Sequence, residues 1–205
     1  MNDLKSSKKS SKLFHQATAL ALILSTAWLT TETSMANQVD DQTFQIEEAT
    51  IASIQAAIQE GRIDCEQLIQ RYLQRIKMLN FSLERGAPLN AFTALNPNAV
   101  RQAKALDRHF KQNNALIGPL HCVPIAVKDN IDTVDTPSTS GSLALLGSQP
   151  ISNAFLVNQL RSAGGIMIGK AAMDEFASGG EGISGRSGRI GNAYDPNQNS
   201  GGSSG

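Results

Sequence analysis

A lysine follows an apolar run in the middle of the chain, at a position where it could act as a general base. Lys128 comes directly after the run VPIAV at residues 123–127, which is typical of a buried strand. Ligands of open α/β sheets bind beyond the carboxyl ends of the strands. Burial disfavours the charged form of an amine, so a buried lysine can accept a proton. The alternative is a lysine that reaches the solvent or pairs with Asp129 or Asp132, and the residues leave both interpretations open.

Two serines close to the last residue offer hydroxyl groups. Ser203 and Ser204 lie in the segment GGSSG, which by itself is a weak motif because such segments are common in flexible linkers. A serine between glycines can also be held in a backbone conformation of the kind found at active sites. With Lys128 they would form a Ser–Ser–Lys system, in which a neutral lysine takes a proton, through a bridging serine, from an attacking serine. The stretch 179–205 is therefore either a disordered tail or an active-site loop.

The remaining composition argues against several other functions. Lys plus Arg and Asp plus Glu are 18 each, so the charge balance does not indicate a nucleic-acid partner. The histidines, His15, His109 and His121, are far apart in sequence, and the spacing of Cys65 and Cys122 is not that of a metal site. A histidine-bound metal is therefore not expected. The cysteines could pair, but two buried thiols are the favoured interpretation.

The first 36 residues have the layout of a secretory signal peptide. Four lysines within the first 12 residues precede an apolar run from Ala17 to Leu29, which is too short to span a bilayer comfortably. Small residues, Ser34 and Ala36, then stand before Asn37. The alternatives are a buried core helix and an uncleaved membrane anchor. We expect cleavage after Ala36, export to the periplasm or beyond without stable membrane insertion, and a mature chain in which a disulfide is permissible.

Apolar periodicity predicts alternating helices and strands in the mature chain. A helix with isoleucines at helical spacing ends near Gly61, and a second begins at Asp64 with Gln67 completing a capping box. This alternation predicts an α/β fold with a mixed, largely parallel sheet flanked by helices, with VPIAV as its buried central strand. The further elements are expected at 91–95 (strand), 99–110 (helix), 154–163 (helix) and 166–168 (strand).

Several segments occur in a characteristic order along the chain, namely LNAF, GPLHCVPIAVKDNID, TPSTSGS, GKAAMDEFASGGEG and NAYDPNQNSGGSSG. Together with the opening helices at 49–80, this series resembles the amidase signature family from about Glu47 onward. The resemblance implies that Lys128 is the catalytic base and that Ser203 is the bridging serine, with its peptide bond in the cis form. It also implies that Ser178, Gly179 and Gly180 present backbone to the substrate.

The chain departs from the family pattern at three places. Cys122 stands where the family usually has glycine, and the segment GISGRSGRIGN at 182–192 resembles its counterpart only loosely. The resemblance places the family's attacking serine in a later Gly-Gly-Ser-Ile-like segment, which has no counterpart in residues 1–205. Residues 37–205 are therefore interpreted as the N-terminal part of an amidase domain, with an incomplete sheet and no activity of their own.

The resemblance implies hydrolysis of the C–N bond of a small carboxylic amide through an acyl-enzyme, without metal, organic cofactor or nucleic-acid partner. One alternative is the glutamine-hydrolysing component of a tRNA-dependent amidotransferase, which shares these motifs. The signal peptide argues against it, because charged tRNA is cytoplasmic. A second alternative is a non-functional remnant of a broken gene.

Overall fold

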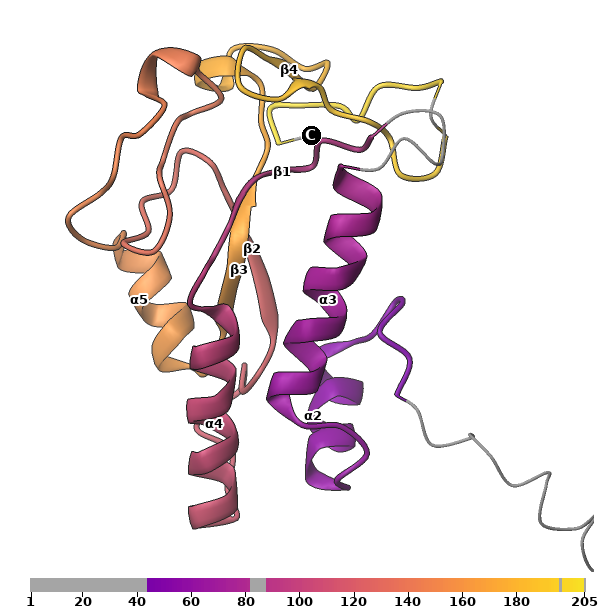
Figure 1. Ribbon diagram of the computed structural model, residues 1–205, viewed down its shortest axis with the longest axis vertical. Helices are drawn as coiled ribbons and strands as arrows, with labels where there is room; N and C mark the ends of the chain where they lie inside the picture. Colours follow the sequence, from indigo (N-terminus) through magenta and orange to yellow (C-terminus); the bar gives the residue numbers. More distant parts are fainter. Residues whose placement is uncertain (1–43, 82–87, 196, 205) are drawn as a thin grey trace, which may run out of the picture. The chain divides into compact units, whose positions relative to one another are not determined.

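The computed structural model describes residues 44–81, 88–195 and 197–204, so the expected signal peptide at 1–36 lies outside the described residues. Helices α2 to α5 surround a three-stranded sheet (Figure 1). Within these residues no helix is both long and apolar enough to cross a membrane.

The helices begin and end close to the predicted positions. Helix α2 spans Ile51–Gln59 and helix α3 spans Cys65–Asn80. The Asp64 carboxylate accepts a hydrogen bond from the Gln67 amide at 2.8 Å, and the Gln67 side chain accepts one from the Asp64 amide at 3.3 Å. This confirms the capping box, which satisfies amide donors that the first helical turn leaves unpaired. Two further helices follow, α4 (Ala99–Asn113) and α5 (Phe155–Ser162).

The sheet is mixed, and its order corrects one prediction. Strands β1 (Phe92–Leu95), β2 (Pro124–Lys128) and β3 (Ile166–Ala171) lie in the order β1-β3-β2. Strand β3 is antiparallel to β1 and parallel to β2. The VPIAV run was expected to be central, but it lies at the edge of the sheet among the described residues, and within β2 only Val127 is buried. The central position belongs to β3, which has a neighbouring strand on each side and is buried from Ile166 to Lys170.

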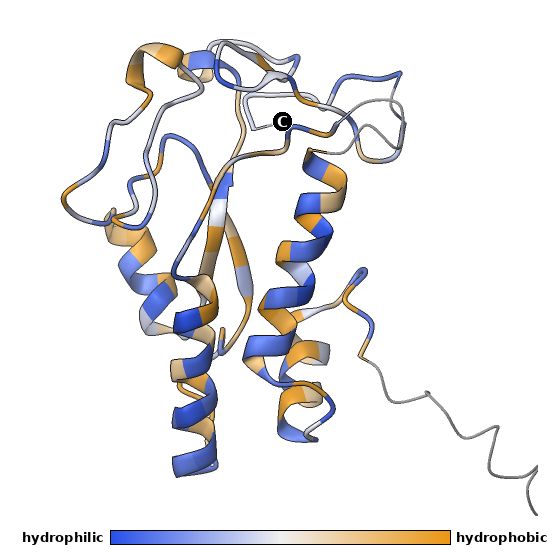
Figure 2. Ribbon diagram, in the orientation of Figure 1, coloured by the Kyte–Doolittle hydropathy of each residue, from blue (hydrophilic) through white to orange (hydrophobic). Residues whose placement is uncertain are grey.

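Each face of the sheet packs against helices. On one face, Ile166 and Ile168 of β3 join the buried apolar residues of α2, α3 and α4. On the other face, Val127 and Met167 pack against Val157 of α5. The strands are largely apolar, whereas α3 and α4 carry polar residues as well (Figure 2). This packing leaves the carboxyl ends of β2 and β3 directed toward the long loops.

The start of α3 is joined covalently to the chain just before β2. Cys65 and Cys122 form a disulfide, and both are fully buried. The expectation of two buried free thiols is therefore wrong, because the fold brings the two residues to a Cα separation of 5.4 Å, which suits a bond between the sulfurs. Cys122 has a φ of 64°, in the left-handed region that favours glycine. This conformation accounts for a family pattern with glycine at this position.

Candidate active site

Lys128 and Ser203, which are 75 residues apart in sequence, meet at the end of β2. The Lys128 Nζ atom lies 2.5 Å from the Ser203 Oγ atom, within hydrogen-bond distance, and both residues are partly buried. The tail is therefore folded back as a loop onto the strand end (Figure 1). Of the two interpretations of residues 179–205, the structure supports the loop and contradicts the disordered linker.

Asp174 holds the segment that carries Ser203. The Asp174 amide donates a hydrogen bond to the Ser203 carbonyl oxygen at 3.1 Å, and its carboxylate accepts one from the Ile183 amide at 2.7 Å. A side chain at Gly202 would collide with the Asp174 Oδ2 atom and would lie 2.8 Å from the Gly180 Cα atom, so this close approach requires glycine. The peptide bond between Gly202 and Ser203 is cis, as the resemblance implied.

The three candidate substrate-binding residues lie beside this segment. Ser178, Gly179 and Gly180 follow the short 3-10 helix η2 (Glu175–Ala177), and all three are exposed. Gly180 packs against Gly202, the neighbour of Ser203. The structure therefore brings Gly180 next to the segment that carries Ser203, and the role of the three residues in binding substrate stays a prediction.

Lys170 and Asp129, the residue that follows Lys128, form an ion pair that the sequence did not predict. Asp129 was considered as a partner of Lys128, but its carboxylate instead lies 3.7 Å from the Nζ atom of Lys170 on β3. Both side chains are completely buried. Burial lowers the pKa of Lys170, while the negative charges of Asp129 and Asp132 act in the opposite direction. One feature of the sequence could have indicated a second buried lysine. Lys170 directly follows the apolar run IMIG, just as Lys128 directly follows VPIAV.

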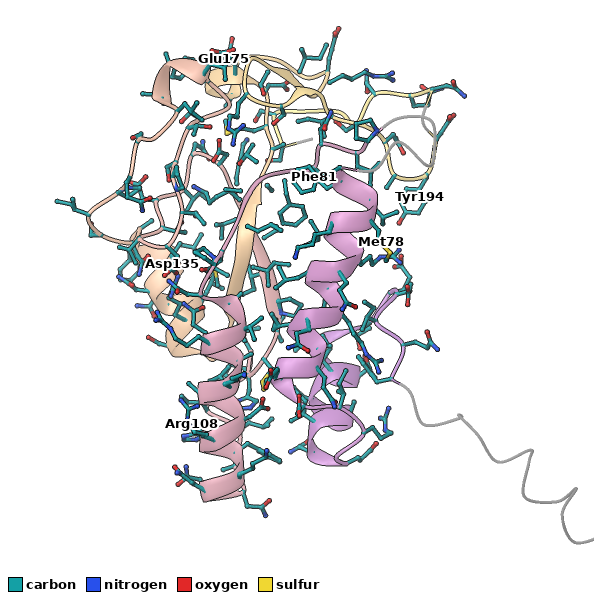
Figure 3. All side chains as sticks on the ribbon, viewed as in Figure 1. Met78, Phe81, Arg108, Asp135, Glu175 and Tyr194 are labelled. Carbon is teal, nitrogen blue, oxygen red and sulfur yellow. A yellow bond between two sulfur atoms is a disulfide. The ribbon has the colours of Figure 1, made fainter. Side chains whose placement is uncertain are left out.

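Glu175 adds a charged side chain at the loop end of the molecule, whereas Arg108 of α4 lies at the opposite end (Figure 3). Hydrogen bonds from the Ser142 side chain and from the Gly185 amide lower the pKa of Glu175. The Gly185 amide lies 3.0 Å from the Glu175 Oε2 atom. This carboxylate is therefore negatively charged at neutral pH.

One group of potential metal ligands lies at the other end of β2. Cys65, His121 and Cys122 are buried, and their ligand atoms lie within 4.8 Å of one another. The Ile117 amide donates a hydrogen bond to His121 Nδ1 at 3.2 Å, so the proton of the neutral ring is on Nε2, which faces the Cys65 sulfur at 3.7 Å. A metal ion would need free thiolates and an unprotonated Nε2, so the disulfide form does not fit one.

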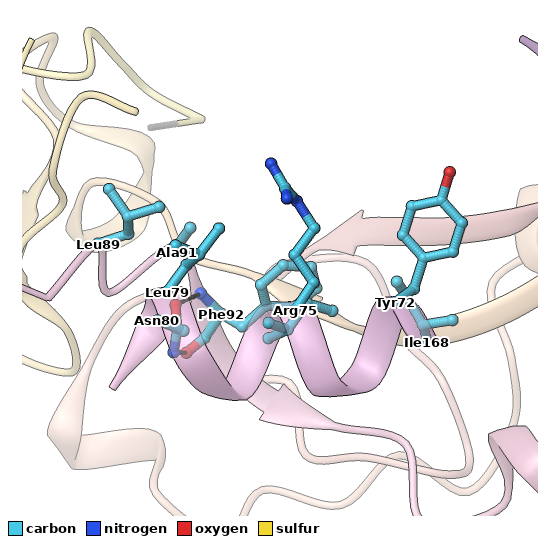
Figure 4. A pocket seen from close by; sticks show the side chains of 9 residues that line it. Tyr72, Arg75, Leu79, Asn80, Leu89, Ala91, Phe92 and Ile168 are labelled. Atoms are coloured by element: carbon cyan, nitrogen blue, oxygen red, sulfur yellow. Dashed lines mark hydrogen bonds between the residues drawn. The ribbon is translucent and has the colours of Figure 1, made fainter. Parts of the chain in front are cut away.

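An apolar hollow of about 220 Å³ lies between α3 and β1 (Figure 4). Tyr72, Ile76 and Leu79 of α3 and Phe92 of β1 line it, with Arg75 at its side. Neither Lys128 nor Ser203 contributes to its wall, so it is separate from the candidate active site.

Known proteins share this arrangement of elements. A family model described as amidase matches residues 67–205. A probable amidase of Arabidopsis thaliana is 38% identical over 166 residues, which cover 80% of this chain and 31% of the relative. The A component of the glutamyl-tRNA(Gln) amidotransferase of Methanosarcina mazei is 35% identical over 156 residues, which cover 76% of this chain and 30% of the relative.

The similar solved structures agree with these sequence matches. The native peptide amidase from Stenotrophomonas maltophilia superposes with a TM-score of 0.69 at 38% identity, over 77% of this chain and 32% of the other. A fatty acid amide hydrolase superposes with a TM-score of 0.71 at 19% identity, which shows the fold alone. The chain spans about a third of the length of the relatives it matches. Because the family model covers more than half of the sequence, the chain belongs to the amidase family.

Proposed function

We propose that this chain supplies the base and the proton relay of an enzyme that hydrolyses a small carboxylic amide through an acyl-enzyme intermediate. The observation that carries the proposal is the contact of 2.5 Å between the Lys128 amine and the Ser203 hydroxyl. The two groups are within the distance over which a proton is transferred directly.

In the proposed reaction, an attacking serine gives its proton to Ser203 as it bonds to the amide carbon, and Ser203 passes its own proton to the neutral amine of Lys128. The tetrahedral intermediate then collapses, and the leaving nitrogen receives a proton from Lys128 through Ser203. Water hydrolyses the resulting ester by the same relay in reverse. Side chains and water supply every proton and bond in this sequence.

We infer that the attacking serine belongs to a part of the gene product outside residues 1–205. Ser203 is engaged as the relay, and the family segment with the nucleophile has no counterpart in this sequence. Residues 1–205 alone are therefore proposed to be inactive. Ser178, Gly179 and Gly180 are exposed, and Gly180 lies next to Gly202, which supports a role for their backbone in holding the substrate amide near Ser203.

The second part of the proposal is that the protein is exported from the cytoplasm. The basic start, the apolar run and the small residues before Asn37 favour a cleaved signal peptide. The Cys65–Cys122 disulfide supports an oxidising compartment, because such bonds are rare in the cytosol. Both features favour an exported amidase over an enzyme component that acts on charged tRNA. N-terminal sequencing of the exported protein should begin at Asn37, and an intact Met1 in the cytoplasm would contradict export.

The test of the reaction uses the gene product at full length, after sequencing the frame downstream of residue 205. A fluorophosphonate probe should label a serine of the longer protein and leave a protein of residues 1–205 unlabelled. Ser203→Ala should slow amide hydrolysis in the longer protein. It should not abolish hydrolysis, because a water molecule can take the place of the Ser203 hydroxyl in the proton relay. Stoichiometric labelling at Ser203 would show that Ser203 is the nucleophile, and a stop codon after residue 205 would favour the remnant.

A further inference from the structure

Lys170 is a buried charge that the proposed mechanism does not use. It lies on β3 opposite Val127 of β2, and its side chain is completely buried. Its Nζ atom donates to the Ser138 hydroxyl at 2.7 Å and to the carbonyl oxygens of Pro137 and Asp129 at 3.3 and 3.4 Å. Protein acceptors thus replace the water that an ammonium group normally binds, which is the condition for burying it.

Asp129 makes the burial of Lys170 relevant to Lys128, which is its neighbour in sequence. The Asp129 carboxylate accepts hydrogen bonds from the Thr139 hydroxyl and from the Gly141 amide. Its Oδ1 atom has no hydrogen bond and faces Lys170 at 3.7 Å. A buried carboxylate without a counter-charge is strongly unfavourable, so the position of Asp129 depends on Lys170.

The same cluster reaches the segment that carries Ser203. The Asp129 carbonyl oxygen accepts from the Ser140 amide at 3.3 Å, and the Ser140 carbonyl oxygen accepts from the Phe176 amide at 2.8 Å. Phe176 follows Asp174 by two residues, and the Asp174 amide holds the Ser203 carbonyl oxygen. Both partners of the Lys128–Ser203 contact are therefore connected to the Lys170–Asp129 pair. Lys128 is connected through the peptide bond to Asp129, and Ser203 is connected through the backbone hydrogen bonds just described.

We propose that the Lys170–Asp129 ion pair positions Lys128 against Ser203. Lys170 is a positioning residue that acts through Asp129 and does not touch the reacting atoms. The effect on turnover rests on the proposed function, whereas the effect on the Lys128 side chain is a property of this chain and can be measured without catalysis.

The experiment is trace acetylation of lysines with acetic anhydride in the full-length gene product, read residue by residue by mass spectrometry. In Lys170→Met, Lys128 should be acetylated several-fold faster, because an unpaired Asp129 shifts and releases the Lys128 amine from Ser203. Lys104, which pairs with Glu66 at 3.1 Å on the surface, is the internal reference. Lys77→Met, at an exposed position in the last turn of α3, is the control variant and should leave the labelling of Lys128 relative to Lys104 unchanged.

Rescue separates positioning from a general loss of structure. The double variant Asp129→Asn/Lys170→Met leaves no unpaired charge buried and should bring the Lys128 rate back toward the wild-type value. Should Lys170→Met not fold, Ser138→Ala removes one acceptor of the Lys170 ammonium and should raise the Lys128 rate by a smaller factor.

Two outcomes would overturn the proposal. One is a wild-type rate at Lys128 in folded Lys170→Met, or in Ser138→Ala if Lys170→Met does not fold. The other is an equal rise at Lys128 and Lys104 in the single and double variants. Where turnover is measurable, kcat should fall with KM nearly unchanged. Full activity of Lys128→Ala would refute the proposed function and leave the labelling result standing.

Discussion

Strand β2 is held at both of its ends, but by different interactions. Just before its start, Cys122 is bonded to Cys65, next to the neutral side chain of His121, and all three residues are fully buried. Just after its end, Asp129 is held by the charge of Lys170 and by hydrogen bonds from the following loop. A covalent bond needs no water or counter-charge, so it can lie within the hydrophobic core that the sheet forms with α2, α3 and α4.

The difference explains why the candidate site lies at the far end of the strand. At the starting end neither sulfur is free to react, because the two are bonded to each other. The far end buries one lysine, Lys170, with its counter-ion and leaves the other, Lys128, partly exposed beside Ser203. It is also the carboxyl end of two parallel strands, where α/β sheets collect ligands.

The largest contrast is expected in catalysis. In the full-length protein, Lys128→Ala should reduce kcat by several orders of magnitude, because it removes one member of a cooperating catalytic unit. The double variant Cys65→Ala/Cys122→Ala, at the other end of the strand, should keep a kcat close to that of the wild type. Steady-state kinetics on a small amide, with circular dichroism as the folding control, measures both. Near-normal turnover by folded Lys128→Ala would refute the assignment of the base.

The two lysines should differ most in stability. Lys170→Met should lower the free energy of unfolding by about 3–5 kcal/mol, because it leaves the Asp129 carboxylate buried without a counter-charge. Lys128→Met should change it by no more than about 1 kcal/mol, since the Lys128 amine is partly exposed and makes a single hydrogen bond. Urea unfolding measures the two values. Equal midpoints for the two variants would contradict the distinction between a structural and a functional lysine.

Loss of the Cys65–Cys122 disulfide should lower stability by less than loss of Lys170, and it should leave the surroundings of Lys128 unchanged. The cysteines are 57 residues apart, and Cys65→Ala/Cys122→Ala should lower the free energy of unfolding by about 2–4 kcal/mol. The acetylation of Lys128 relative to Lys104 should remain at the wild-type ratio, because the disulfide lies at the other end of β2. A changed ratio would show that the two ends of the strand are coupled.

The smallest expected effect is a loss of stability at acidic pH. Burial lowers the pKa of His121 below its usual 6.5, and the nearby charge of His109 acts in the same direction. As the pH falls below 6.5, the unfolded chain takes up a proton that the folded chain excludes, so stability decreases until the folded pKa is reached. Within that window stability falls with falling pH, by at most about 1.4 kcal/mol per pH unit, which is the value for one proton. This slope should disappear in His121→Gln and persist in His109→Gln, and an unchanged slope in His121→Gln would assign it to another group.

Local features of the fold were predictable because they depend on neighbouring residues. The capping box of Asp64 and Gln67, the helix end before Gly61 and the apolar runs of β2 and β3 are decided within a few positions along the chain. The contact between Lys128 and Ser203 was also anticipated, but it came from the resemblance, since a lysine and a Gly-Ser tail have many uses. The order of the strands was not predictable, because an apolar run is compatible with either a central or an edge position.

The sequence alone determined where helices α2 to α5 and strands β1 to β3 form and which lysine and serine were candidates for chemistry. Only the tertiary structure decided that Cys65 and Cys122 are bonded, that β3 is central and that Asp129 pairs with Lys170 rather than with Lys128. These outcomes join residues that are far apart in sequence, from 41 positions for Asp129 and Lys170 to 79 positions for the paired residues Phe92 and Ala171. They depend on which surfaces are buried together, and burial makes an unpaired charge too unfavourable to remain without a partner.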